Sequence, residues 1–108
     1  MPKRRNTKQR PIDYVASGEW PHAVLEPSLA AAYAQEFARN LRRVTQDMTL
    51  RQAAQVAGLD PMTIRALVNG YTWADTVSVA KLEFGFDQLL WPRDGTRRAL
   101  LRAESQRP

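Results

Sequence analysis

The sequence predicts an all-α protein made of five short helices packed into one compact domain. Three observations predict this fold. Apolar residues recur at intervals of three and four along 29–44, the period of an amphipathic helix. Ser28, Thr49 and Asp60, residues that favour helix N-termini, precede three expected helices, and glycines that favour helix ends follow the second and third of these. No run alternates apolar and polar residues over a length that would predict a strand.

The first helix is expected to begin after Ser28, which directly follows Pro27. Alanines at five of its positions add helix propensity. The polar residues at 46 and 47 interrupt the pattern and end the helix. Its apolar stripe consists of Leu29, Tyr33, Phe37, Leu41 and Val44.

The second and third helices are expected at 50–57 and 61–68. Thr49 is the N-cap of the second helix. Asp60 is the N-cap of the third, and Pro61 takes the first helical position, where a missing N–H costs nothing. Asn69 and the glycine after it end the third helix, because both tolerate positive φ.

The spacing of Ala54, Gly58 and Ile64 indicates that these two helices cross. A small residue in the first helix allows a close approach, and Gly58 lets the chain leave it in a left-handed conformation. Two helices joined in this way form a helix-turn-helix, whose second helix can enter a DNA major groove. Short helices with a glycine turn also occur in plain helical bundles, the alternative interpretation of this pattern.

A fourth helix is expected from about 75 to 84, with Gly85 closing it. Its inner face is expected to carry Val77, Ala80 (or Val79) and Phe84. Asp87 is then the cap of a short fifth element over 87–91, which Pro92 stops. Residues 96–103 are compatible with one or two further helical turns, although no apolar stripe supports them.

Charge divides the chain into four parts. Residues 1–11 carry five positive charges and no acid, 12–28 carry three acids and no Lys or Arg, 29–91 carry six of each sign, and 92–108 carry five arginines against two acids. We therefore expect a basic disordered arm, a semi-ordered lead-in packed through Trp20, Val24 and Leu25, a folded domain, and a basic C-terminal extension. Basic ends suit a polyanion such as nucleic acid, although charged ends also simply keep a small domain soluble.

The composition excludes several classes of protein. The 108 residues contain no cysteine, so disulfides and cysteine-ligated metals are excluded. No window has the roughly 20 apolar residues of a membrane-spanning helix, and no secretory signal follows the basic N-terminus. We expect a cytoplasmic, nucleoid-associated protein with no membrane contact. The chain has a single histidine, His22, its glycines are scattered, and no carboxylate stands at a helical spacing from a plausible base. We therefore expect neither an enzyme, nor a cofactor, nor a metal site.

Residues 29–91 resemble the lambda-repressor-like, or Cro/XRE, family of transcriptional regulators. The resemblance rests on TLRQAAQVAGLDPMTIRALVNG at 49–70 and VSVAKLEFGFDQLL at 77–90. It implies a compact five-helix domain that binds double-stranded DNA, usually as a homodimer on a palindromic operator. Two departures stand out. Leu50 replaces a glutamine that binds phosphate in many members, and Pro61 and Met62 replace residues that are commonly polar.

The resemblance makes 61–68 the recognition helix. Arg65 is the main candidate for reading a base, because its guanidinium fork matches guanine O6 and N7; contact with phosphate or solvent is the alternative. Met62 and Ala66 are expected at thymine methyl groups. The full expected recognition surface is Pro61, Met62, Thr63, Arg65, Ala66 and Asn69.

Other residues are expected at the DNA backbone or at a second copy of the chain. The backbone candidates are Thr49, Arg51, Tyr71, Thr72 and Trp73. The basic arm, Lys3, Arg4, Arg5, Lys8 and Arg10, is expected either to follow a minor groove or to be a plain disordered tail. The expected dimer face is Phe86, Leu90 and Trp91, whereas Phe84 and Leu89 are assigned mainly to the core.

These features predict a sequence-specific DNA-binding regulator, a repressor of phage or small bacterial type that acts by occupying its operator. The alternative is an antitoxin-like DNA-binding protein whose terminal segments, chiefly 1–28, bind a partner protein. A helical scaffold without a nucleic-acid role is a third interpretation. The first two share DNA binding and differ in what the ends of the chain do.

Overall fold

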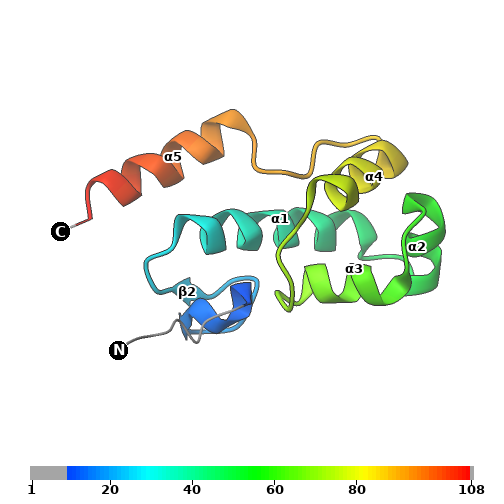
Figure 1. The fold of residues 1–108 in the computed structure, drawn as a ribbon, viewed down its shortest axis with the longest axis horizontal. Helices are drawn as coiled ribbons and strands as arrows, with labels where there is room; N and C mark the ends of the chain where they lie inside the picture. The colour runs from blue at the N-terminus through cyan, green and yellow to red at the C-terminus, as the bar shows by residue number, and fades with distance from the viewer. Residues whose placement is uncertain (1–9, 108) are drawn as a thin grey trace, which may run out of the picture.

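The computed structural model describes residues 10–107, which form five α-helices and one small two-stranded sheet (Figure 1). The mostly helical prediction is confirmed, and the prediction of no strand is wrong. In chain order the elements are the 3-10 helix η1 (Pro11–Tyr14), β1 (Val15–Ser17), β2 (Val24–Leu25), α1 (Leu29–Thr45), α2 (Leu50–Ala57), α3 (Pro61–Val68), α4 (Thr76–Phe86) and α5 (Asp94–Ser105).

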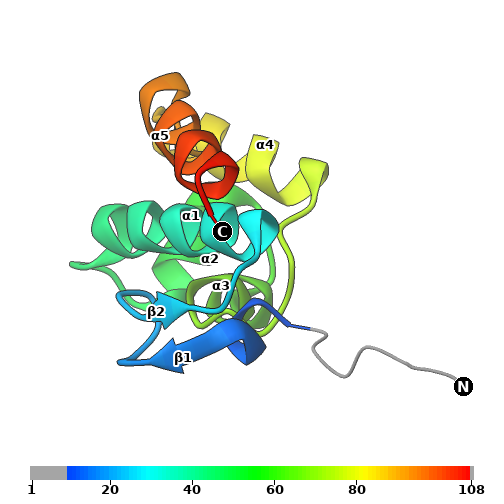
Figure 2. The ribbon, with the colours of Figure 1, turned by 90° about the vertical axis from the view of Figure 1, so that its left-hand side faces the viewer.

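Helix α1 is the central element of the fold. Its N-cap is Ser28, whose side chain accepts a hydrogen bond from the Ala31 amide, as the sequence predicts. Phe37 and Leu41 of the predicted stripe are fully buried. In Figures 1 and 2, α5 lies along one side of α1, and α3 with the N-terminal hairpin lies along the other.

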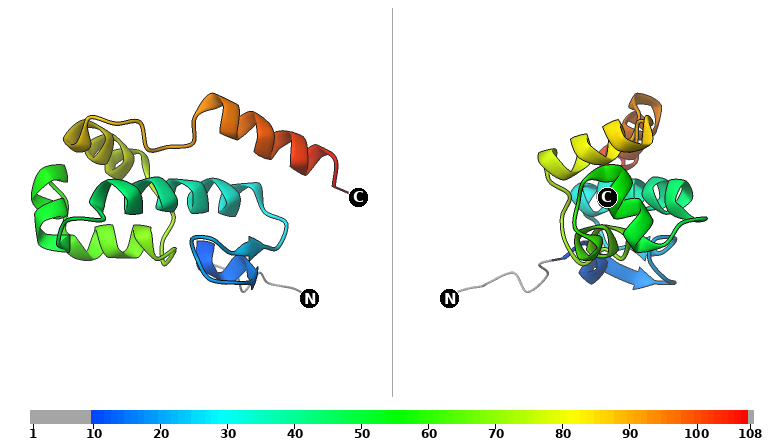
Figure 3. Two further views of the ribbon diagram at one scale, coloured as in Figure 1. Left: turned by 180° about the vertical axis from the view of Figure 1, so that it is seen from behind. Right: turned by 90° about the vertical axis from the view of Figure 1, so that its right-hand side faces the viewer.

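The core lies where α1, α2, α3 and α4 meet. Helix α2 stands across the ends of α1 and α3 (Figure 3). The buried side chains of the core are mostly aliphatic and small, which allows the short helices to approach closely. They are Phe37, Leu41, Ala53, Ala54, Ala57, Ile64, Leu67, Leu82 and Leu90.

Residues 10–28, which include the predicted lead-in, form a hairpin against α1. Strands β1 and β2 pair antiparallel over only two or three residues, too short for an alternating pattern to appear in the sequence. The side chain of Gln35 is buried and exchanges two hydrogen bonds with the backbone of Ala23, at 3.0 and 3.2 Å. Arg39 Nε donates to Pro21 O at 2.7 Å. These polar groups of α1 hold the hairpin, and the apolar periodicity of α1 could not predict this role.

Two predictions for the N-terminal part need correction. Arg10 and Pro11 belong to the ordered structure and not to a disordered arm: Arg10 is the N-cap of η1, and Pro11 is buried. Val24 does not pack onto the domain, because 64% of its surface is exposed. Trp20 and Leu25 are partly buried, as expected.

Helix α4 continues through Gly85 to Phe86, so Gly85 does not close it. A Cβ at Gly85 would lie 2.5 Å from Val56 O and 3.0 Å from Ala57 Cα, so this glycine marks the point where α4 crosses α2. Asp87 ends α4 in a left-handed conformation, with φ of 52°, and caps no following helix. Residues 87–91 form no helix. The inner face of α4 is also corrected: Ser78 and Leu82 are buried, whereas Val77, Ala80 and Phe84 are exposed. Val79, the alternative to Ala80, is partly buried against the core, as predicted.

The fifth helix is α5, which lies in the predicted C-terminal extension. It is longer than the one or two turns compatible with the sequence at 96–103, and it packs along α1 without a buried residue of its own. Its arginines face outward, and its partly buried positions are Thr96, Leu100 and Glu104, so no apolar stripe appears in its sequence. No helix in the described part of the chain is long and apolar enough to cross a bilayer.

Candidate nucleic-acid interface

Helix α2 begins with a reciprocal capping box. Thr49 Oγ1 accepts from the Gln52 amide at 3.1 Å, and Gln52 Oε1 accepts from the Thr49 amide at 2.9 Å. The predicted cap is therefore confirmed, and it uses the Thr49 amide and one acceptor site of the Thr49 hydroxyl within the protein. Since Gln52 and Thr49 are already paired, the first-turn amides left for an outside anion are those of Leu50 and Arg51.

The turn between α2 and α3 follows the prediction. Gly58 has φ of 70°, and its amide and that of Leu59 both donate to Ala54 O, at 2.8 and 3.1 Å. Ala54 and Ile64 are buried where the helices meet. Asp60 stands at the N-cap of α3, but its side chain makes no capping hydrogen bond, so only its backbone carbonyl serves the first turn. Its exposed carboxylate places a negative charge at this end of α3.

The predicted recognition surface lies on the outer side of α3. Ile64 and Leu67 face the core, and Met62 and Arg65 are exposed, with Met62 at 58%. Arg65 therefore presents its guanidinium on the side of α3 that faces away from the core. The remaining members are partly buried; they are Pro61, Thr63, Ala66 and Asn69.

The turn after α3 extends this surface. Gly70 has φ of 73°, and the Tyr71 amide donates to Ala66 O at 2.9 Å, which folds the chain back along the helix end. Tyr71, Thr72 and Trp73 are all exposed. The predicted backbone residues thus lie next to the recognition surface in the chain and on the outside of the protein, together with the exposed Thr49 and Arg51 at the start of α2.

The N-terminal segment is packed against the end of α3, a feature that the sequence analysis missed. Trp20 Nε1 donates to Val68 O at 3.0 Å, and the Ile12 amide donates to Gly70 O at 2.9 Å. A Cβ at Gly70 would lie 2.7 Å from the Trp20 ring. The sequence indicates one reason for glycine at 70, the positive φ at a helix end. The second reason, the contact with Trp20, comes from a residue 50 positions away.

Arg10 is the basic-arm residue that the structure describes, and it lies at the candidate interface. Its guanidinium stands 5.8 Å from the centre of the Tyr71 ring and forms an ion pair with Asp13 at 2.8 Å. The hydrogen bond and the charge of Asp13 raise the pKa of Arg10. Tyr14 meets Trp73 edge to face, with ring centroids 6.2 Å apart. The arm residues Lys3, Arg4, Arg5 and Lys8 lie outside the described residues.

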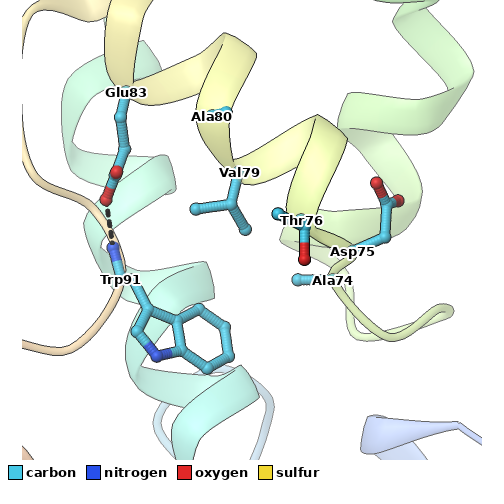
Figure 4. A pocket seen from close by; sticks show the side chains of 7 residues that line it. All are labelled: Ala74, Asp75, Thr76, Val79, Ala80, Glu83 and Trp91. Atoms are coloured by element: carbon cyan, nitrogen blue, oxygen red, sulfur yellow. Dashed lines mark hydrogen bonds between the residues drawn. The ribbon is translucent and has the colours of Figure 1, made fainter.

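The predicted dimer face is wrong in its choice of residues. Leu90 is fully buried, and Phe86 and Trp91 are partly buried against the core. Glu83 Oε2 accepts from the amides of Leu90 and Trp91, at 2.8 and 3.0 Å. Figure 4 shows the hydrogen bond to Trp91. This carboxylate and Asn40, which donates to Leu90 O at 2.9 Å, hold the 87–91 segment in place.

The residues that the sequence assigned to the core near this segment are exposed instead. Phe84 is 89% exposed and Leu89 is 60% exposed. Trp91, expected to be the most exposed of the group, packs against Tyr33 and Phe37 with ring centroids 6.0 and 5.7 Å away. Period alone could not assign the faces of α4, because apolar residues occur on both its sides.

Two further surface features carry no chemistry of their own. A groove of about 430 Å³ lies between α4 and Trp91, with Val79 and Ala80 on its wall (Figure 4). A second hollow, of about 280 Å³, is lined by His22 and the arginines on the outer side of α1. In the part of the chain that the structure describes, His, Asp and Glu side chains form no group suited to a metal ion.

Comparison with known proteins adds no relative to this description. No family model matches the chain, and no curated protein and no solved structure is significantly similar to it.

Proposed function

We propose that this chain is a sequence-specific double-stranded DNA-binding regulator with a lambda-repressor-like domain, and that it represses transcription by occupying its operator. The observation that carries the proposal is the α2–α3 pair. Two short helices cross through a left-handed glycine, and the second helix presents Met62 and Arg65 on its outer side. This is the arrangement that places a recognition helix in the major groove.

The surroundings of α3 support the same use. The exposed turn 71–73 and the start of α2 flank the recognition surface in the chain, so groups for phosphate contacts stand at both ends of the helix pair. Arg10 lies beside Tyr71, with its charge paired with that of Asp13. The exposed Asp60 opposes DNA binding at one point, so we expect the neighbouring arginines, 51 and 65, to supply the local attraction.

One feature departs from the resemblance on which the proposal builds. Residues 29–91 contain four helices, and the fifth lies beyond them as α5. The 87–91 segment takes the place of a helix and is held by Glu83. We propose that the domain uses α1 to α4 as its DNA-binding unit, with the hairpin and α5 as supports on either side of α1.

We propose that the protein acts as a homodimer, and that its second copy binds through the exposed side of α4. Val77 and Phe84 are seven residues apart, which puts them on one face of the helix. In a two-fold antiparallel pair of helices, each of these residues can meet the other in the second copy, as an isologous interface requires. A patch of two exposed apolar side chains suits a weak dimer, which binding to two adjacent DNA half-sites would stabilise.

The antitoxin-like alternative gains no support from the lead-in. Residues 10–28 contact the protein's own α1 and α3, and Pro11, Pro21 and Ala23 are buried there. This segment has a structural use within the chain, so we propose a regulator without a dedicated partner protein. We likewise propose no enzymatic activity and no cofactor.

The test is selection of bound sequences from a random duplex pool, followed by affinity measurements over a range of salt. We expect enrichment of a two-fold symmetric site whose half-sites are one helical turn apart, or a multiple of it, and a steep fall of affinity with salt. Arg65→Ala should lower affinity for the selected site by about tenfold and relax the preference at one guanine per half-site.

Arg97→Ala is the matched control, because it removes the same charge from the exposed side of α5. We expect it to leave base preference unchanged. Absence of any enriched duplex at low salt would overturn the proposed function. An enriched site whose preference is unaffected by Arg65→Ala would overturn the assignment of α3 as the recognition helix.

A further inference from the structure

A small hollow opens on the outer side of α3, at the centre of the candidate interface. It has a volume of about 210 Å³ and is lined by Met62, Arg65, Ala66 and Tyr71. The first three residues stand within two turns of α3, and Tyr71 closes the hollow from the turn that follows. Met62 and Tyr71 are both exposed, so the hollow is accessible to a ligand that approaches α3 from outside.

The wall that Tyr71 forms is fixed from two directions. Its amide donates to Ala66 O at 2.9 Å, which holds its backbone close to the helix end. Its ring is covered by the Arg10 guanidinium, and Asp13 holds that guanidinium through an ion pair of 2.8 Å. The hollow is therefore built by two segments far apart in the chain, and it does not depend on the helix alone.

The chemistry of the lining selects one kind of group in a major groove. Met62, Ala66 and the Tyr71 ring present carbon surface, whereas Arg65 presents hydrogen-bond donors only. In the major groove the one apolar group on a base edge of ordinary DNA is the C5-methyl of thymine, and the acceptor pair that matches an arginine is O6 and N7 of guanine. For the exocyclic amino groups of cytosine and adenine, the acceptors among these four side chains are the Tyr71 hydroxyl and the weakly accepting sulfur of Met62, so most of the lining offers them no hydrogen bond.

We infer that this hollow receives the C5-methyl group of a pyrimidine, thymine or 5-methylcytosine, that lies next to a guanine bound by Arg65. The inference rests on the proposed function and specifies what the same surface reads. It assigns Tyr71 to base recognition in addition to its place near the backbone, and it gives the apolar start of α3 a use. The protein reads a methyl group together with a guanine. Members of the family that the chain resembles commonly carry polar side chains at the start of this helix.

The experiment uses the full chain and the duplexes that the random-pool selection enriches. Each thymine in the site is replaced in turn by deoxyuridine, which removes only the methyl group, and affinity is measured by fluorescence anisotropy. We expect one thymine per half-site, adjacent to a guanine, at which the replacement weakens binding by about fourfold. Replacing that thymine by 5-methylcytosine should give tighter binding than replacing it by cytosine.

The variants Met62→Ala and Tyr71→Ala should lose this discrimination between thymine and uracil while they keep the preference for guanine. Met48→Ala is the matched control, because Met48 is also an exposed methionine but does not line the hollow. It should leave the ratio of the two affinities unchanged, and circular dichroism checks that each variant is folded.

The outcomes separate this inference from the function on which it rests. If no duplex is enriched, both the proposed function and the methyl-binding hollow are wrong. If a site is enriched but the affinity is the same with uracil as with thymine at every position, the proposed function is supported and the hollow has no role in recognition. If discrimination persists in both Met62→Ala and Tyr71→Ala, the methyl group is read elsewhere, and the assignment to this hollow is overturned.

Discussion

The α2–α3 pair and the stretch from α4 to Trp91 have similar apolar contents but differ in what determines their structure. The helix ends of the pair are set by groups within a few residues of one another, such as Thr49 with Gln52 and Gly58 with Ala54. The α4 stretch is set by distant groups: Asn40 binds Leu90, and Gly85 lies against α2. The sequence predicted the pair correctly. It also predicted a helix at the place of α4, but not which side of that helix is buried, where it ends, or the course of residues 87–91. Local hydrogen bonds can be inferred from neighbouring residues, whereas contacts between distant elements cannot.

The largest expected effect tests the α4 side of this comparison. Gly85→Val should lower the free energy of unfolding by about 3 kcal/mol or more, because the new side chain would overlap Val56 O and Ala57 Cα and force α2 and α4 apart. Chemical denaturation in urea measures it. If Gly85 did not lie against α2, Gly85→Val would lower the free energy of unfolding far less.

Gly95→Ala is the control for this experiment. Gly95 also lies within a helix, α5, but a Cβ there would have nothing within 4 Å. We expect this variant to be as stable as the wild type or up to about 1 kcal/mol more stable, because alanine favours helix more than glycine does. Equal losses at positions 85 and 95 would contradict the close crossing of α2 and α4.

The second prediction separates local from distant causes within the α2–α3 pair. Gly58 and Gly70 have nearly the same backbone conformation, with φ of 70° and 73°. Gly58→Ala should cost about 1 kcal/mol, the penalty of a left-handed alanine, because its Cβ would meet open space. Gly70→Ala should cost about 2 kcal/mol or more, because its Cβ would also meet the Trp20 ring at 2.7 Å.

The measurement is again unfolding in urea, followed by circular dichroism. A Trp20→Ala background provides the sharper test, since it should bring the cost of Gly70→Ala down toward that of Gly58→Ala. An unchanged difference between the two glycines in that background would show that Trp20 does not constrain Gly70.

The smallest effect concerns the N-terminal boundary of α4, which is set by neighbouring residues. Asp75 caps α4: the Ser78 amide donates to one of its carboxylate oxygens and the Ser78 hydroxyl to the other, at 2.8 and 2.9 Å. These hydrogen bonds, first that from the amide and then that from the hydroxyl, lower the pKa of Asp75. A carboxyl whose pKa is lowered by folding stabilises the protein above its unfolded pKa of about 3.9, and this contribution is lost as the pH falls through the folded value.

Asp75→Asn keeps a good cap but cannot titrate. We therefore expect the wild type to be slightly more stable than this variant at pH 7, with the difference disappearing under acidic conditions, as measured by urea unfolding from pH 7 to pH 2. Asp60→Asn is the matched control, because Asp60 holds the same position on α3 without a capping bond from its side chain. A difference of the same size and pH dependence at both positions would contradict the role of Ser78.

The candidate site was predictable to the extent that it lies on α3. Helical period separates Ile64 and Leu67 from Met62 and Arg65, so the inner and outer sides could be assigned before the structure was known. The contribution of Arg10, Tyr14 and Trp20 to the end of α3 could not be predicted, because nothing in a segment of 19 mixed residues specifies which helix it will meet. The hollow at Tyr71 depends on that contact and was therefore invisible as well.

By itself the sequence determined the caps of α1 and α2, the left-handed turn at Gly58, and the two sides of α3, because each depends on residues within one or two helical turns. Only the tertiary structure decided which side of α4 is buried, that Gly85 is a crossing point, and that Glu83 and Asn40 hold an extended segment in the place of a fifth helix. The physical reason is that burial and close approach are properties of pairs of elements. The sequence of one element shows only where its own apolar residues lie, and α4 has apolar residues on both of its sides.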